Sequence, residues 1–196
     1  MEGYFTGILD LYYALMTTED TSAAAPVYEE PRVLAKSIEV TITPTYREGK
    51  LHASNATVRN QKRIDTYTVS LHVDKVPYDV TSEILGRSVD GNGVQIIKGG
   101  NTPPNLALGF ACTLDDGSKE LWWLYKGTFS EISKSASTEA DAIEYQTPTI
   151  EGTFVRRMND DALAATVETS AEGIGADVET SWFTTVYKEK PVTEGP

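Results

Sequence analysis

Cysteine and histidine are scarce in this chain of 196 residues, which contains one cysteine and two histidines. With Cys112 alone, no intramolecular disulfide is available, so we expect a fold that does not need an oxidising compartment. Cys112, His52 and His72 together provide too few ligands for a tetrahedral zinc site. We therefore expect neither a structural metal ion nor any other cofactor.

Long apolar runs and basic residues are also in short supply. Asp10 interrupts the apolar residues 5–16 and no basic segment precedes them, so this pattern supports neither a signal peptide nor a membrane span. We expect the chain to be made and folded in a cytoplasm. Acidic residues outnumber basic ones by 29 to 17, for a formal net charge of −12. Binding to a phosphate backbone depends on clustered lysine and arginine, so the excess argues against a standing affinity for nucleic acid. A simpler interpretation is that it keeps the protein soluble.

The residue types that carry out catalysis lack the neighbours they would need. His52 lies in a polar segment and His72 alternates with apolar residues on a threonine-rich strand, so neither is placed beside a nucleophile. Cys112 falls on the apolar side of a predicted strand, where a free cysteine behaves as a small hydrophobic residue. The acidic pairs occupy predicted turns or a loop, where aspartate bonds the local backbone; they are residues 29–30, 115–116 and 160–161. We predict a protein without an active site.

Apolar and polar residues alternate along much of the chain, as in β-strands with one buried face. The predicted apolar faces are formed by Ile38, Val40 and Ile42 in one strand and by Tyr67, Val69, Leu71 and Val73 in another. Between these strands, residues 46–64 form a long polar connection. Such a connection is uncommon in a compact domain unless it is functional or disordered.

A hairpin is predicted over residues 106–126, because Asp116-Gly117 suits a two-residue type I′ turn. That turn would pair Phe110 with Trp123 and would leave large apolar side chains on both faces of residues 121–125. A sheet with one wet face does not carry this pattern. The second face must be covered either by another layer of the same domain or by a neighbouring subunit.

Two short helices and further strands complete the prediction. A helix over residues 77–87 would have Asp79 as its N-cap and Gly86 as its stop. A second would follow Asp177 and place Val178, Trp182 and Val186 on one side. Strands are expected over residues 144–157 and 163–169. We expect one domain, residues 1–196, with a compact body over about residues 32–170, an N-terminal segment 1–31 and a C-terminal arm 171–196.

An ordered series of segments suggests a family. Its members here are residues 10–15, 37–44, 51–55, 83–86, 144–154 and 182–187. In this order and spacing the set resembles the major tail protein, or tail-tube protein, of long-tailed, siphovirus-type bacteriophages and prophages, over about residues 7–187.

The resemblance implies a fold and a function. The fold would be dominated by β-strands, with two packed antiparallel sheets forming a sandwich or barrel-like body and a short flanking helix. The function would be that of a structural virion protein that forms hexameric rings, stacked into the tail tube through which viral DNA passes without specific binding. The implied partners are further copies of the chain and the tape-measure, tail-terminator and tail-tip proteins, and the implied location is the virion tail after synthesis in a bacterial host.

The resemblance also suggests two sets of site residues. The polar connection 46–64 takes the place of a loop between rings, with Arg47, Lys50, Arg59, Lys62 and Arg63 as its basic residues. Polar strand faces would line the lumen, with Glu39, Thr41, Thr43, Thr66, Thr68, Ser70 and Glu151 as candidates. An outer sheet face washed by solvent would have the same composition.

Two other classes of function remain open at this point. A monomeric β-sandwich module that binds carbohydrate or acts as an adhesin would use an exposed Trp122 or Trp123 to stack on sugar, with a calcium-bearing acidic loop as support. The third class, and the least favoured of the three, is a hydrolase whose catalytic groups are the carboxylates in the predicted turns.

Overall fold

A computed structural model describes residues 4–53, 56–133, 147–175 and 177–190. The strands in this part of the chain are β1 Phe5–Ile8, β2 Leu11–Thr18, β3 Val27–Tyr28, β4 Arg32–Ala35, β5 Ser37–Ala53, β6 Ala56–Val73, β7 Ser88–Val89, β8 Gln95–Ile96, β9 Leu106–Leu114, β10 Lys119–Phe129, β11 Thr149–Val155 and β12 Ala164–Glu168. The helices are α1 Tyr78–Ile84 and α2 Val178–Ser181. Residues 144–146 of one predicted strand lie outside the described residues.

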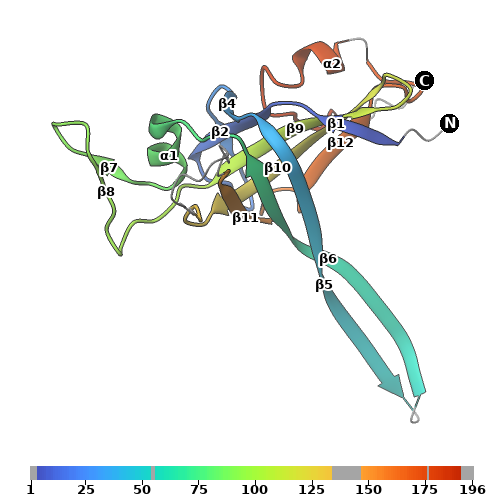
Figure 1. The fold of residues 1–196 in the computed structure, drawn as a ribbon. Coiled ribbons are helices and arrows are strands. Elements are labelled where there is room, and N and C mark those ends of the chain that lie inside the picture. The colour runs from blue at the N-terminus through green and yellow to red at the C-terminus, as the bar shows by residue number, and fades with distance from the viewer. Residues whose placement is uncertain (1–3, 54–55, 134–146, 176, 191–196) are drawn as a thin grey trace, which may run out of the picture.

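Ten of the strands form one antiparallel sheet, and β7 and β8 form a separate two-stranded ribbon. The main path of the sheet is β3-β2-β9-β10-β11-β6-β5, while β4 pairs with β2, β1 with β9 and β12 with β10. In Figure 1 the strands form a body from which β5 and β6 project as a long hairpin. The segment before residue 32 therefore contributes three strands, β1, β2 and β3, to this sheet.

The sheet curls around its main core. Leu11 of β2, Leu108 of β9 and Leu71 of β6 are distant along the path of the sheet, yet they belong to one buried cluster. The helix α1 adds Ile84 to this cluster. Such contacts require the two ends of the sheet to face each other as packed layers, with β1 lying beside the start of β5. This arrangement confirms the predicted β-dominated sandwich or barrel-like fold with a flanking helix.

A second core covers the opposite face of the β9–β10 hairpin. It combines Trp123 and Leu121 of β10 with Trp182 and Val186, which follow α2. The Trp123 Nε1–H donates a hydrogen bond of 2.9 Å to the carbonyl of Trp182. The predicted grouping of Trp182 and Val186 on one side is confirmed, and a layer of the same chain covers the second face of this hairpin.

The register of this hairpin differs from the prediction by one residue. Trp122 pairs with Phe110 and Trp123 with Gly109, so the predicted pairing of Phe110 with Trp123 is wrong. The turn takes in Asp115 as well as Asp116 and Gly117, because the Asp116 carboxylate accepts the Ser118 N–H while Gly117 adopts a φ of 84°. The pairing places the large Trp123 ring over Gly109, where an added Cβ would lie 2.8 Å from that ring.

Two local predictions also need correction. Asp79 lies in the first turn of α1 rather than at its N-cap, which is Pro77, whose carbonyl accepts the Thr81 N–H. Gly86 does end the helix region, with a φ of 61°. Ile38 is exposed and does not share the inner face with Val40, because the pairing of β5 with β6 is irregular between Ser37 and Glu39.

Candidate assembly surfaces

The ends of β5 and β6 form an arm that projects from the body (Figure 1). Cross-strand pairing continues from Tyr46–Ile64 to Ala53–Ala56, so the prediction of a loop over residues 46–64 is wrong. The two strands satisfy each other's backbone groups, and the arm side chains whose burial the structure describes, at residues 46–49 and 61–64, are exposed. The residues of the arm do not show the hydrophobic alternation by which strands are recognised, although their backbones pair across the hairpin.

The arm is basic within an acidic chain. Residues 46–64 contain five basic residues and a single acidic one, Glu48. Near its base, Arg47 pairs with Asp65 at 3.0 Å and the Lys62 ammonium lies 4.0 Å from the centre of the Tyr46 ring. The structure thus places all five residues predicted for contact between rings on one projecting element: Arg47, Lys50, Arg59, Lys62 and Arg63. Their role in stacking stays a prediction.

The predicted lumen residues share one face of the sheet. Directly paired residues of neighbouring strands point to the same side. The pairing of β5 with β6 and of β6 with β11 therefore aligns residues in rows across these three strands. The rows are Glu39–His72–Thr149, Thr41–Ser70–Glu151, Thr43–Thr68–Thr153 and Thr45–Thr66–Val155. We call this surface the hydroxyl face. Most of its side chains are exposed, so no other described part of the chain covers it.

The opposite side of the same strands is the main core. The rows there are Val40–Leu71–Ile150, Ile42–Val69–Gly152 and Pro44–Tyr67–Phe154. Leu71, Val69, Ile150 and Phe154 are fully buried. Burial of this face fixes which side of the strands must remain polar, because a slip of one residue would exchange the two faces.

Three hydroxyl residues of this face were not predicted from the sequence. Thr45 and Thr149 complete two rows, and Thr153 pairs with Thr68 of β6 on one side and with Thr128 of β10 on the other. The alternation of Thr149, Glu151 and Thr153 with Ile150 and Phe154 was a usable signal. Nothing local in the sequence indicated that β11 lies beside β6.

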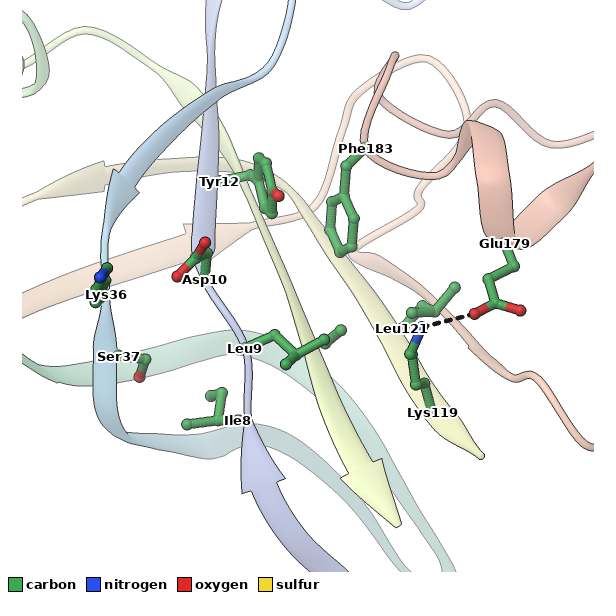
Figure 2. A pocket seen from close by; sticks show the side chains of 11 residues that line it. Ile8, Leu9, Asp10, Tyr12, Lys36, Ser37, Lys119, Leu121, Glu179 and Phe183 are labelled. Carbon is green, nitrogen blue, oxygen red and sulfur yellow. Dashed lines mark hydrogen bonds and ion pairs between the residues drawn. The ribbon is translucent and has the colours of Figure 1, made fainter. Parts of the chain in front are cut away.

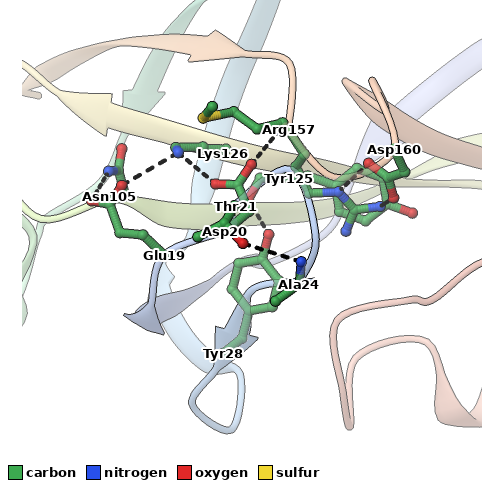
Figure 3. Close-up of polar contacts among 11 residues, drawn as sticks. Glu19, Asp20, Thr21, Ala24, Tyr28, Asn105, Tyr125, Lys126, Arg157 and Asp160 are labelled. Carbon is green, nitrogen blue, oxygen red and sulfur yellow. Dashed lines mark hydrogen bonds and ion pairs between the residues drawn. The ribbon is translucent and has the colours of Figure 1, made fainter.

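A buried polar cluster joins the segment after β2 to the middle of β10 (Figure 3). Asp20 is buried and pairs with the Lys126 ammonium at 2.5 Å, and its second oxygen accepts the Met158 N–H. Burial acts to raise the pKa of Asp20, but the hydrogen bonds from Lys126 and Met158 outweigh it and lower that pKa. Glu19 contacts both Lys126 and the Asn105 amide, from a more exposed position. We call these residues the Asp20 cluster.

Next to the Asp20 cluster, Arg157 packs against Tyr125 and forms an ion pair with Asp160. Its guanidinium lies 3.7 Å from the centre of the Tyr125 ring and pairs with Asp160 at 2.5 Å. The Tyr28 hydroxyl donates to the carbonyl of Tyr125 at 2.8 Å, and burial raises the pKa of both tyrosines to about 12. These groups are satisfied within the chain and hold residues 20–28 against the body.

The residues considered for other functions lie mainly in packing positions. Trp123 is fully buried and is not available to stack on sugar, and Trp122 is half-buried against the Phe110 ring, 5.9 Å away. Burial raises the pKa of the half-buried Cys112 thiol to about 11, which keeps it protonated at neutral pH. His72 lies on the hydroxyl face and bonds Thr147. Among the described residues, no three His, Cys, Asp or Glu side chains are grouped to hold a metal ion.

None of the described helices combines the length and the apolar character that crossing a bilayer requires.

One family model matches most of the chain, and several solved structures are similar to it. Residues 38–172 match the family described as phage tail tube protein. The anti-feeding prophage cap, a tube-terminating cap, is similar at 9% identity and a TM-score of 0.48, over 85% of this chain and 93% of that chain. A chain of the PVC sheath–tube complex, an extracellular contractile injection system in its extended state, is similar at 10% identity and a TM-score of 0.45, over 83% and 89%. An Hcp protein is similar at 9% identity and a TM-score of 0.37, over 83% and 99%. No curated protein matched the chain.

Proposed function

Because the chain belongs to the phage tail tube protein family and is therefore a structural component of a virion tail, we propose that it forms hexameric rings that stack into a tube for viral DNA. In this proposal the hydroxyl face lines the lumen and the basic arm reaches the adjacent ring. The tape-measure protein occupies the tube before DNA does, and the tail terminator and tail-tip proteins close its ends.

The observation that carries the proposal is the hydroxyl face. It is a largely exposed surface of three adjacent strands backed by the main core, and the only Asp, Glu, Lys or Arg side chains in its four rows are the acids Glu39 and Glu151. Duplex DNA carries one negative charge per about 1.7 Å of its axis, and each lysine or arginine that pairs with phosphate strengthens binding by releasing counterions. A wall of hydroxyls and carboxylates leaves DNA mobile.

The sheet also has an unpaired edge suited to association between copies. Among the described residues, β5 has one paired neighbour, β6, although it is the second-longest strand. An open edge of this length is a template for a further strand. Durable interfaces between identical copies bury about 2,000 Å² or more, so strand pairing must be joined by side-chain packing.

Assembly is the first test of this proposal. Each copy carries a formal charge of −12, so copies repel one another over a Debye length of about 8–10 Å, and added salt screens that repulsion. We expect purified protein to form rings or tubes of uniform diameter as concentration and salt rise, seen by sedimentation and negative-stain electron microscopy. A protein that stays monomeric throughout would contradict the proposal and favour the monomeric binding module.

A charge reversal tests the orientation of the hydroxyl face. Glu39→Lys with Glu151→Lys places two new cations per subunit in neighbouring rows. We expect tubes of this variant to retain short duplex DNA at low salt and to release it at high salt, whereas wild-type tubes do not retain it. The measurement is co-sedimentation of labelled duplex with assembled tubes.

The matched control for that test carries the same change in charge elsewhere. Glu30→Lys with Glu172→Lys alters two exposed residues away from the hydroxyl face. If the control retains DNA as strongly as the Glu39 and Glu151 variant, the hydroxyl face is not the lumen wall.

A further inference from the structure

The arm leaves the body where the sheet narrows from three strands to two. Up to Thr66, β6 pairs with β5 on one side and with β11 on the other, and the last shared row is Thr45–Thr66–Val155. Since β11 ends at Val155, the pairing described beyond this row is that of β5 with β6 alone. In Figure 1 the two strands exchange sides just outside the body, as the strands of a strongly twisted two-stranded ribbon do.

A β-bulge lies at the same point. Thr45 pairs with Thr66 and Tyr46 pairs with Ile64, so Asp65 is an extra residue of β6 with no paired residue opposite it in β5. An extra residue of this kind bends its strand and increases the local twist. Because the backbone ladder is irregular where the third strand ends, the direction of the arm depends on side-chain contacts. We call residues 45–46 and 64–66 the joint.

The Asp65 carboxylate contacts a cation on each side of the joint. Its Oδ1 lies 3.0 Å from the guanidinium of Arg47, which belongs to the arm. The same oxygen lies 3.6 Å from the guanidinium of Arg156, the residue that follows β11 on the body. The Asp65 and Arg156 side chains are 28% and 32% exposed, so the contact on the body side is partly shielded from solvent.

Arg156 is also held from the body side. Its Nη1 lies 2.8 Å from the carboxylate of Asp161, which adopts a left-handed φ of 58° that aspartate tolerates in a turn. The next residue, Arg157, is buried and is fixed by Asp160 and the Tyr125 ring. A single exposed ion pair contributes little, whereas several charges in one network on a fixed support can define a geometry.

We propose that Asp65 is the positioning residue of the arm, and that its bridge between Arg47 and Arg156 fixes the direction in which the arm leaves the body. A subunit whose arm already points toward the adjacent ring loses less conformational freedom on stacking than one whose arm swings. This consequence rests on the proposed function. The direction of the arm does not, because the bridge lies within a single subunit.

A distance distribution in the unassembled subunit tests the bridge. Spin labels are attached to Gln61→Cys on the arm and to Thr166→Cys on β12 of the body, two exposed positions, in a Cys112→Ala background. Pulsed double electron–electron resonance is expected to give a narrow distribution for this parent. Asp65→Ala is expected to widen the distribution at least about twofold, because a two-stranded ribbon without its side-chain ties samples a wide range of twist.

The matched control removes an exposed acid from an ion pair that lies within the body. Lys119 and Glu179 pair at 2.8 Å, and Figure 2 shows this pair beside the groove between the β1–β2 connection and α2. Glu179→Ala makes the same change in charge as Asp65→Ala and is expected to leave the width of the distribution unchanged.

A second variant removes only the body side of the bridge. Arg156→Gln leaves the contact between Asp65 and Arg47 intact and is expected to widen the distribution as Asp65→Ala does. The two substitutions together are expected to widen it no further than either alone, because they break the same bridge. Circular dichroism identifies the variants that fold, and Arg156→Gln decides the test if Asp65→Ala does not.

Stacking provides a separate measurement. Asp65→Ala is expected to form rings as wild type does and to need an about threefold to tenfold higher concentration for half-assembly into tubes, since each arm must be ordered on contact. Sedimentation measures this concentration, and negative-stain electron microscopy distinguishes rings from tubes.

The outcomes separate this proposal from the one it builds on. An unchanged width in either folded variant, or an equal widening by Glu179→Ala, would overturn the bridge as the determinant of arm direction, whatever the assembly does. A widened distribution with tubes at the wild-type concentration would overturn its role in stacking. If the distribution widens but wild type forms no tubes, the proposed function falls and the positioning role of Asp65 stands.

Discussion

Replacing residues 48–62 with Asn-Gly is expected to leave a folded subunit that forms rings but no tubes. Arg47 and Arg63 are directly paired, so a two-residue turn can close the shortened hairpin between them. The described residues of the excised segment pair with one another across the two strands, and those whose burial is described, 48, 49, 61 and 62, are exposed and outside both core clusters. We therefore expect the thermal midpoint to change by only a few degrees while stacking is lost. Circular dichroism reports the first quantity and electron microscopy the second.

A control separates the length of the arm from the presence of a new turn. Replacing Ser54-Asn55 with Asn-Gly introduces the same dipeptide between the paired residues Ala53 and Ala56 and keeps the full length. This variant is expected to form tubes. Tubes formed by the shortened variant would show that the arm does not join rings, and loss of folding would show that the body depends on it.

Asp20→Asn is expected to cost about 3–5 kcal/mol of unfolding free energy, because it leaves the buried Lys126 ammonium without its closest carboxylate. In a chain of this size such a loss lowers the thermal midpoint by roughly 6–20 °C. Urea denaturation of the unassembled subunit measures the effect. Combining Asp20→Asn with Lys126→Met removes the unpaired charge, so the double variant should lose less than the sum of the two single losses.

Glu19→Gln is the matched control for the Asp20 variant. The Glu19 side chain is 65% exposed and lies 3.4 Å from the same ammonium, so its loss should cost less than about 1 kcal/mol. A loss as large as that of Asp20→Asn would mean that the burial of Asp20 is not what makes its ion pair important.

The effect of Asp20 should also depend on pH with a definite sign. The pKa of Asp20 is lower in the folded protein than in the unfolded chain, because the bonds from Lys126 and Met158 favour the carboxylate over the burial that opposes it. The stability it contributes is therefore fully present above its unfolded pKa, about 3.9, and is lost as the pH falls through the lower folded value. The difference in stability between wild type and Asp20→Asn should be largest near neutral pH and should narrow below about pH 4. A difference that grows on acidification would contradict this assignment.

Alternation was the dependable signal in the sequence. Val69, Leu71 and Val73 on one side of a strand and Thr68, Ser70 and His72 on the other are separated by the geometry of the strand itself, whatever strand lies beside it. The split between main core and hydroxyl face could therefore be predicted. The grouping of Trp182 with Val186 was also predicted, but both residues follow the one-turn helix α2, so it is their packing in the second core and not helical spacing that brings them together.

Predictions failed where the outcome depends on contacts distant in sequence. The register of the β9–β10 hairpin depends on whether Asp115 joins the turn, and a type I′ turn was an equally reasonable choice from the same residues. The arm was taken for a loop because its sequence shows no apolar alternation, and its strands pair with each other while the described side chains at its base, residues 46–49 and 61–64, are exposed. The buried ion pair of Asp20 was not predicted, since nothing near Asp20 in sequence indicates Lys126 or the Met158 N–H.

The sequence alone determined the composition of the two strand faces, the scarcity of catalytic and metal-binding residues, and the family to which the chain belongs. Only the tertiary structure decided that β5, β6 and β11 combine their hydroxyl residues on one surface, and that the basic residues of the β5–β6 connection lie on a projecting arm. The physical reason is that side-chain direction along a strand is set by the local backbone, whereas strand neighbours and exposure are set by which distant segments gain most from burial together.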